Sequence, residues 1–223
     1  MTLRLFERET LVSDAVLPHD LLGLDGATDL VAESLPGWAN DSLRQTPLVV
    51  ARRARPQGLL IPVGVRGNQR NERVAAFLSA TRITRRMRPE DLVTSRAWFH
   101  APRAGLFPLF AALDAVASSL ESTGLIWGPT GSMGFELASG YATITTDSDI
   151  DLVLRAPAPL PRELATDLLS AWSLLPVRID AQVEVPTGAV SLAEYASGAA
   201  QIVLRTDQGP RLITDPWTTE ETR

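Results

Sequence analysis

The chain of 223 residues contains no cysteine, which excludes a disulfide framework, a thiolate zinc site and a cysteine nucleophile. Such a chain suits a reducing compartment. Its first ten residues, MTLRLFERET, lack the apolar core of a signal peptide. The sequence also has no run of about 18 apolar residues that would span a bilayer. We therefore expect a cytoplasmic protein that does not contact membranes.

Lysine is also absent, so all 21 basic residues are arginine, and the net charge is −5. General binding to nucleic acid requires a basic surplus and is not expected. The charges are unevenly distributed: twelve arginines lie between Arg52 and Arg103 against three acids, whereas the rest of the chain has 23 acids and nine arginines. A positive segment inside an acidic chain indicates a site for an anionic ligand or partner.

An apolar fraction of 45% and a charged fraction of 21% are typical of a folded protein with a buried core. The element pattern predicts an α+β or mixed α/β fold in two domains. Residues 1–100 would form a small Arg-rich domain that binds substrate or partner, and residues 101–223 a catalytic domain. In the first domain we expect strands in the apolar runs 48–50 and 59–65 and a helix over 71–81.

The second domain has clearer boundaries. Proline at the start and apolar residues on one face predict helices that begin at Pro108 and Pro161. Apolar runs and alternation predict strands between and after these helices, a short helix after a Gly-Ser turn, and a C-terminal hairpin. The expected strands are 125–127, 149–155 and 177–185, and the short helix covers 133–138.

The strongest local signal is the segment TDSDIDLVL, which contains Asp149 and Asp151. Residues two apart on a strand project to the same side, so the two carboxylates would share one face. Adjacent carboxylates repel unless a cation lies between them, and hard oxygen ligands suit Mg²⁺, or Mn²⁺ in its place. The alternative is a pair of solvated acids at a strand end.

The segment VRIDAQVEV, residues 177–185, alternates strictly between apolar and polar residues. Its polar face would add a third catalytic and metal-binding carboxylate if this strand pairs with the one that bears Asp149 and Asp151. We favour Asp180 for this position, with Glu184 in reserve. The alternative is a polar face in contact with solvent.

A Gly-Pro-Thr-Gly-Ser turn precedes the predicted short helix. Gly131 would let the backbone approach phosphate oxygens, and the Ser132 hydroxyl would donate to them. An ordinary strand-to-helix turn is the alternative.

Within the positive segment, Arg66, Arg70 and Arg73 form the pattern Arg-Gly-x-x-Arg-x-x-Arg. If the chain becomes helical after Gly67, Arg70 and Arg73 would lie on one helical face. Guanidinium groups suit bidentate contacts with phosphate, so we assign these arginines to substrate phosphates. A solvated face that contacts an acidic protein partner is the alternative.

Taken in order, Gly131, Ser132, Asp149, Asp151 and Asp180 resemble the pattern of the nucleotidyltransferase superfamily typified by DNA polymerase beta. That pattern has Gly-Ser at a helix start, Asp-x-Asp on a strand and one more Asp on a later strand. The resemblance implies a polymerase-beta-type catalytic domain with a mixed sheet. Sixteen residues separate Ser132 from Asp149, an interval longer than usual.

A closer resemblance covers nearly the whole chain. Four segments resemble the phosphoribosyl-dephospho-CoA transferase family of malonate decarboxylase, also called malonate decarboxylase holo-acyl-carrier-protein synthase: PHDLL (18–22), PVGVRG (62–67), WGPTGSMGFEL (127–137) and SDIDL (148–152).

The resemblance implies a specific reaction. A member of this family takes 2′-(5″-triphosphoribosyl)-3′-dephospho-CoA and attaches the phosphoribosyl-dephospho-CoA group to a serine of the acyl-carrier subunit of malonate decarboxylase, with release of diphosphate. Asp149 and Asp151 would hold Mg²⁺ at the triphosphate. Asp180 would complete a second metal position or help to remove the serine proton.

Two other functions fit the same residues. One is another metal-dependent nucleotidyltransferase that acts on a small molecule or a nucleic-acid end. The other is a non-catalytic module that binds an acyl-carrier protein.

Overall fold

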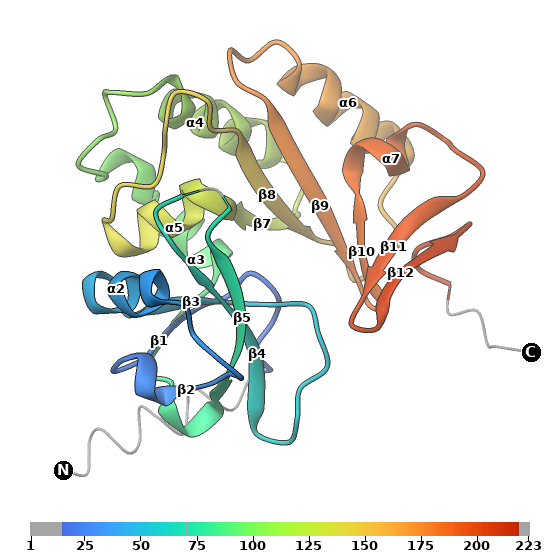
Figure 1. Ribbon diagram of the computed structural model, residues 1–223. Coiled ribbons are helices and arrows are strands. Elements are labelled where there is room, and N and C mark those ends of the chain that lie inside the picture. Colours follow the sequence, from blue (N-terminus) through green and yellow to red (C-terminus); the bar gives the residue numbers. More distant parts are fainter. Residues whose placement is uncertain (1–14, 70, 219–223) are drawn as a thin grey trace, which may run out of the picture. The chain divides into compact units, whose positions relative to one another are not determined.

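The computed structural model describes residues 15–69 and 71–218, and the chain divides into two compact units, Met1–Arg88 and Pro89–Arg223. Each unit contains a six-stranded sheet with helices packed on it (Figure 1). The predicted α+β class with a mixed sheet is confirmed. Among the described residues, no helix is long and apolar enough to cross a lipid bilayer.

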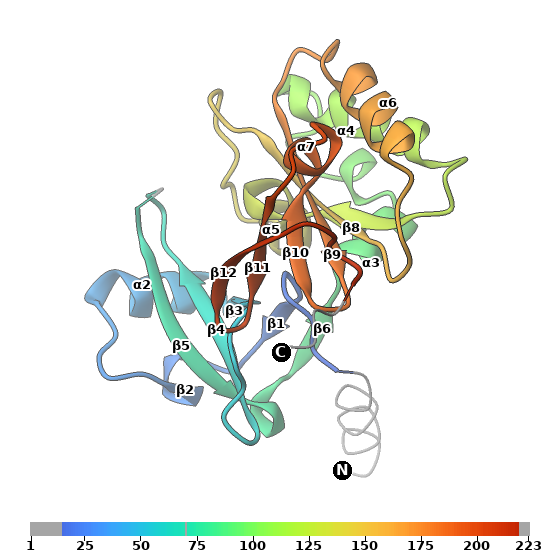
Figure 2. The ribbon, with the colours of Figure 1, turned by 90° about the vertical axis from the view of Figure 1, so that its right-hand side faces the viewer.

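The sheet of the first unit has the order β2-β5-β4-β3-β1-β6, and its neighbouring strands pair antiparallel. The long hairpin of β4 and β5 is seen clearly in Figure 2. The elements are β1 (Leu21–Gly23), η1 (Ala27–Asp29), β2 (Leu30–Val31), α2 (Gly37–Gln45), β3 (Leu48–Ala51), β4 (Leu60–Arg66), β5 (Arg73–Ser79), η2 (Ala80–Arg82) and β6 (Arg85–Met87).

One face of this sheet forms the core of the first unit. Alternate residues of neighbouring strands, such as Val49, Val65 and Leu78, are buried and pack with Ala39 and Leu43 of α2. The Ser42 hydroxyl of α2 also donates to the Arg66 carbonyl at the end of β4. The strands predicted in the apolar runs 48–50 and 59–65 are therefore confirmed as β3 and β4.

Asp20, in the segment PHDLL, is fully buried. Its Oδ2 accepts hydrogen bonds from Arg86 Nε at 2.8 Å and from the Leu17 N–H at 2.9 Å. Removing one partner of a buried ion pair costs about 3–5 kcal/mol, because the other charge is left uncompensated. Asp20 thus joins the start of β1 to β6 and has a structural role.

The predicted helix over 71–81 is wrong, because these residues form β5. Its pattern has period two: Val74, Ala76 and Leu78 face the core, and Leu78 is fully buried. Phe77, which stands at helical spacing from Val74 and Leu78 in the sequence, lies on the opposite side of the strand from Leu78. Seven register pairs with β4 decide between the two patterns, and the sequence window alone does not contain them.

The second unit has the sheet order β12-β11-β10-β9-β8-β7. Among the described strands of this sheet, β8 and β9 are the only parallel neighbours, and α6 forms the crossover between them. The elements are α3 (Pro89–Thr94), η3 (Ala97–Phe99), α4 (Pro108–Leu120), β7 (Ile126–Pro129), α5 (Gly131–Ser139), β8 (Ile150–Arg155), α6 (Arg162–Trp172), β9 (Ile179–Val185), β10 (Gly188–Ser191), α7 (Leu192–Ala196), β11 (Ile202–Thr206) and β12 (Gly209–Ile213).

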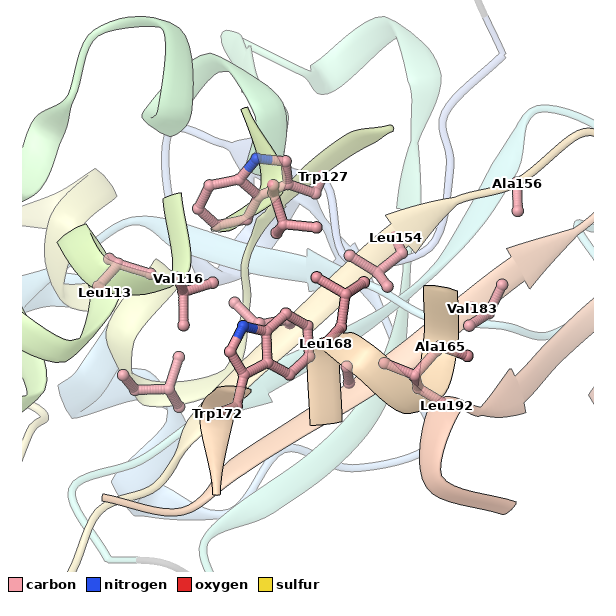
Figure 3. Close-up of a cluster of buried hydrophobic side chains, with 14 of the residues drawn as sticks. Leu113, Val116, Trp127, Leu154, Ala156, Ala165, Leu168, Trp172, Val183 and Leu192 are labelled. Atoms are coloured by element: carbon pink, nitrogen blue, oxygen red, sulfur yellow. The ribbon is translucent and has the colours of Figure 1, made fainter. Parts of the chain in front are cut away.

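The predicted helices and strands of the second half are confirmed with small shifts at their ends. The apolar face of the sheet packs against α4 and α6 (Figure 3). Trp172 of α6 is 3% exposed and donates through Nε1 to Ser119 Oγ at 2.9 Å. Burying a large apolar side chain contributes about 1.5–3 kcal/mol, so this layer fixes α4 and α6 on the sheet.

The two units divide between Arg88 and Pro89, whereas the sequence predicted 1–100 and 101–223. Pro89 lies so close to Gly128 of β7 that a Cβ on Gly128 would be 2.2 Å from the Pro89 carbonyl carbon. Trp98 is 2% exposed within the core of the second unit. The short elements α3 and η3 pack against β7 and α4. They are too short to show a periodic pattern in the sequence, so the sequence did not assign them to the second unit.

Candidate active site

Two carboxylates lie side by side on the polar face of the second sheet. In the parallel register of β8 and β9, Asp151 is the partner of Asp180. Neighbouring strands are about 4.8 Å apart, and register partners project to the same face. The other face of β8, with Ile150, Leu152 and Leu154 all at most 1% exposed, belongs to the core. The predicted pairing of the two Asp-bearing strands is therefore confirmed.

Gly131 lies directly against the Asp151 carboxylate. A Cβ on Gly131 would be 1.9 Å from Asp151 Oδ2, and its φ of +58° is one that other residues rarely adopt. The Thr130 N–H donates to the Asp151 carbonyl at 2.8 Å, which joins the bend to β8. Glycine is required here both for the backbone conformation and for space beside the carboxylate.

The same bend begins α5. Gly134 donates its N–H to the Thr130 carbonyl, and a Cβ on Gly134 would be 2.5 Å from the Pro129 carbonyl oxygen. The N–H groups of a first helical turn have no intrahelical acceptor and attract anions. Half-buried Ser132 occupies this first turn. Gly131 thus lies beside Asp151 and Ser132 follows it in the chain, and the contact of both with phosphate stays a prediction.

Asp149 lies two residues before Asp151, just ahead of β8, and is half-buried. The next residue is fixed to the neighbouring strand, because the Ile150 N–H donates to the Arg178 carbonyl at 2.9 Å. Asp149, Asp151 and Asp180 therefore come from the amino-terminal ends of β8 and β9.

The donor set of this site consists of carboxylate oxygens, which suit Mg²⁺ or Mn²⁺. Among the described residues, no group of three acidic or histidine side chains is placed to hold one metal ion. Mg²⁺ commonly binds to one or two carboxylates and completes its shell with substrate phosphates and water. The register pair Asp151 and Asp180 fits that mode, and a metal shared by three carboxylates stays a prediction.

Asp180 also has a cationic neighbour on its own strand. Arg178 Nη2 lies 3.5 Å from Asp180 Oδ2, and the two side chains are 74% and 45% exposed. An exposed pair of this kind contributes little to stability because water screens it. Glu184, the reserve choice, is the register partner of Arg155 at the far end of β8. The register therefore favours Asp180 over Glu184 as the partner of Asp151.

The arginines of the positive segment are arranged differently from the prediction. Arg66 at the end of β4 and Arg73 at the start of β5 are direct cross-strand partners, so the predicted helical face of Arg70 and Arg73 is wrong for Arg73. Arg70 lies outside the described residues. In an antiparallel pair, opposite residues project to the same side, so Arg66 and Arg73 share the face opposite the core.

Two further arginines share this face. The stem of Arg52 passes over Gly64, which lies between Val50 and Ala75 in register, and Arg52 Cδ would be 3.4 Å from a Gly64 Cβ. The stem of Arg85 passes over Gly23, its register partner. The sequence showed the excess of arginine, but only the strand register shows that these four arginines lie on one face of the sheet.

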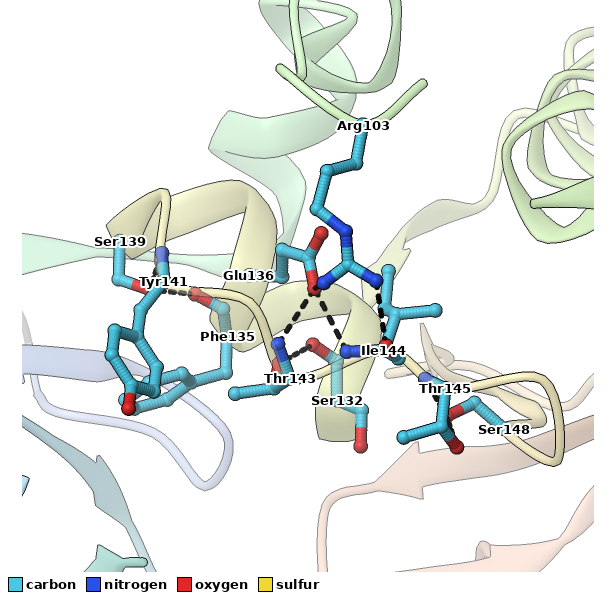
Figure 4. A network of polar contacts seen from close by, with 10 residues as sticks. All are labelled: Arg103, Ser132, Phe135, Glu136, Ser139, Tyr141, Thr143, Ile144, Thr145 and Ser148. Atoms are coloured by element: carbon cyan, nitrogen blue, oxygen red, sulfur yellow. Dashed lines mark hydrogen bonds and ion pairs between the residues drawn. The ribbon is translucent and has the colours of Figure 1, made fainter. Parts of the chain in front are cut away.

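Sequence reasoning missed a buried ion pair next to the site. Glu136 of α5 is 4% exposed, and Arg103 Nη1 donates to its Oε2 at 3.3 Å (Figure 4). A charged residue among the apolar side chains of α5 was the available signal, because acids are rarely buried without a partner.

Two family models match most of the chain. Residues 17–89 match the model of the phosphoribosyl-dephospho-CoA transferase MdcG N-terminal domain, and residues 99–216 match that of the MdcG C-terminal domain. No solved structure matches the chain significantly.

Curated relatives cover almost the whole chain. A phosphoribosyl-dephospho-CoA transferase of Pseudomonas putida (strain GB-1) is 41% identical over 208 residues, which are 93% of this chain and 98% of the relative. The protein of the same name from Azotobacter vinelandii is 42% identical over 203 residues, 90% of this chain and 93% of the relative. The chain thus belongs to the phosphoribosyl-dephospho-CoA transferase family, a family of transferase enzymes.

Proposed function

We propose that this chain transfers the phosphoribosyl-dephospho-CoA group from 2′-(5″-triphosphoribosyl)-3′-dephospho-CoA to a serine of the apo acyl-carrier subunit of malonate decarboxylase. The observation that carries the proposal is the register pair Asp151 and Asp180 beside the Gly131 bend. Family membership gives the transferred group, because the relatives are named for it. The resemblance to the malonate decarboxylase enzymes gives the acceptor.

The reaction is a displacement at phosphorus. The serine hydroxyl oxygen attacks the phosphorus that is attached to the ribose. A new P–O bond forms, the bond to the β-phosphate breaks, and diphosphate leaves with the electron pair. The serine proton passes to a base. Most of the rate in such a step comes from positioning and from stabilisation of charge, so few reactive side chains are needed.

The residues of the site have separate tasks. Asp149, Asp151 and Asp180 would hold Mg²⁺ or Mn²⁺, which offsets charge on the triphosphate and on the leaving diphosphate. The first turn of α5, with Gly131 and Ser132, would donate hydrogen bonds to phosphate oxygens beside Asp151.

The arginines of the first unit would bind a different anionic group from the one bound at the aspartates. Arg66 and Arg73 place two positive charges opposite each other on one face of the sheet. Arg52 and Arg85 add positive charge to the same face. We assign this face, together with Arg70, which lies between β4 and β5 in the sequence, to phosphates of the coenzyme part. An acidic acyl-carrier surface is the alternative ligand of the same chemistry.

Mass spectrometry of the acceptor tests the proposal. The chain is incubated with the apo acyl-carrier subunit, triphosphoribosyl-dephospho-CoA and Mg²⁺, and the carrier mass is compared with that in a sample containing a chelator. A mass increase equal to the prosthetic group, together with released diphosphate, supports the proposal. Transfer of an ordinary nucleotide to another acceptor would show a different nucleotidyltransferase, and carrier binding without any transfer would show a non-catalytic module.

A further inference from the structure

Glu136 is a buried carboxylate that binds the backbone of the loop leading to β8. Its Oε2 accepts hydrogen bonds from the Thr143 N–H at 2.7 Å and the Ile144 N–H at 2.8 Å, besides that from Arg103 (Figure 4). A carboxylate that is 4% exposed needs such donors to offset its lost hydration. Glu136 therefore fixes the backbone of the α5–β8 loop, residues 141–149, at its middle.

Arg103 binds the same stretch of backbone through the Ile144 carbonyl. Its Nη2 donates to the Ile144 carbonyl at 2.8 Å, while its guanidinium lies 4.6 Å from the ring centre of Phe107. The pair thus holds both the N–H and the C=O of Ile144, whose side chain is 3% exposed in the core.

The α5–β8 loop connects the helix that begins at the Gly131–Ser132 bend with the strand that carries Asp151. The Thr143 hydroxyl donates to the Ser132 carbonyl at 2.9 Å, in the first turn of α5. After Ile144 the chain makes one turn, in which the Thr145 N–H donates to Ser148 Oγ at 3.0 Å. Asp149 follows immediately. Ile144 is therefore the buried fixed point of the chain just ahead of that turn and Asp149.

We propose that Glu136 and Arg103 act as a positioning pair that sets Asp149 and Asp151 against the Gly131–Ser132 bend. Neither side chain needs to touch substrate or metal for this role. The proposal rests on the proposed function, because it holds that the loop positions the carboxylates that would bind metal in that function. It also explains how an unusually long interval between Ser132 and Asp149 still gives one loop position.

The test uses Glu136→Gln and the double variant Glu136→Leu/Arg103→Met in the full chain. The glutamine keeps an acceptor oxygen but loses the charge, so we expect kcat to fall about tenfold and the Mn²⁺ dissociation constant to rise by a similar factor, as for lost partners of metal ligands. The KM for the acyl-carrier subunit should change less than about twofold, because the carrier is not held by this pair.

The double variant separates positioning from stability. Replacing a buried ion pair by apolar residues is often neutral for stability. The Thr143 and Ile144 N–H groups then lack their acceptor, so we expect a modestly lowered melting temperature, faster amide exchange in residues 141–149 and, well below that temperature, a loss of kcat of about a hundredfold. Recovery of both stability and kcat in the double variant would overturn the proposal.

Glu194→Gln provides the matched control. Glu194 Oε1 accepts a hydrogen bond from the Val203 N–H at 3.0 Å, so this variant makes the same change at another carboxylate that joins distant backbone. It should leave kcat and Mn²⁺ affinity unchanged. Mn²⁺ binding and amide exchange are measured without turnover. Hence a wild-type chain that fails to modify the carrier refutes only the proposed function, whereas unchanged Mn²⁺ affinity in Glu136→Gln refutes the positioning role.

Discussion

The two sheets of this protein are built alike, but each has a register pair of like charges, and the sign of that charge differs between them. In each, one face packs on helices and the other carries polar side chains. The first sheet places Arg66 opposite Arg73, and the second places Asp151 opposite Asp180. Like charges on register partners repel each other, so each pair gives its sheet face a local charge of one sign.

The difference between the sheets lies in how the strands are connected. β4 and β5 follow each other in the chain and pair as a hairpin, so the arginine pair arises from residues close in sequence. The aspartate pair needs the parallel pairing of β8 with β9, which α6 makes possible as a crossover. A hairpin thus suffices to place the arginines of the proposed anion-binding face together, whereas the candidate metal site depends on the fold of the second unit.

The aspartate pair gives the largest expected effect. Asp151→Asn should lower kcat by more than about a hundredfold, which exceeds the usual cost of losing a partner of a metal ligand. The melting temperature should stay the same or rise, because the substitution relieves repulsion from Asp180. Carrier modification is followed by mass spectrometry and unfolding by circular dichroism. Full activity in this variant would remove the acidic pair from the active site.

The bend beside that pair gives an intermediate effect. Gly131→Ala would strain a positive φ at a cost of about 1–2 kcal/mol and would push its Cβ into Asp151. We expect a loss of kcat of roughly tenfold or more from the displaced carboxylate, since small misplacements in an active site are costly.

Gly140→Ala is the control for this prediction. Gly140 has a φ of +72° at the other end of α5, and a Cβ there would meet no atom within 4 Å. Both variants bear the cost of a positive φ in denaturant titrations, and Gly131→Ala adds the clash with Asp151, but only Gly131→Ala should lose activity. Equal activity in the two would show that contact with Asp151 does not matter.

The arginine pair gives the smallest effect. Arg73→Gln should raise the KM for the triphosphoribosyl donor by roughly fivefold to tenfold and leave kcat nearly unchanged, because one charge-assisted hydrogen bond to phosphate is lost. Arg82→Gln removes the same charge from η2, where Arg82 pairs with Asp29 at 3.6 Å, and should leave KM unchanged. Equal KM values for the two variants would mean that net charge, and not this face, attracts the donor.

Much of the second unit was predictable because its patterns are local. Pro108 and the apolar spacing that follows it specify α4, and strict alternation specifies β9. The first unit was harder because four of its six strands have only two to four residues and because the seven-residue β5 fits two patterns. In β5, apolar residues at helical spacing coincided with a strand pattern, and only pairing with β4 decided between them.

The sequence by itself determined the chemistry that is available: carboxylates at Asp149, Asp151 and Asp180, a Gly-Ser bend, a surplus of arginine and no thiol. These follow from residue type and from periods of two and 3.6 residues, which neighbouring positions carry. Tertiary structure alone decided that Asp151 meets Asp180, that Arg66 meets Arg73, and that Glu136 holds the α5–β8 loop. Such contacts join residues distant along the chain or depend on strand register and burial, which no local pattern specifies.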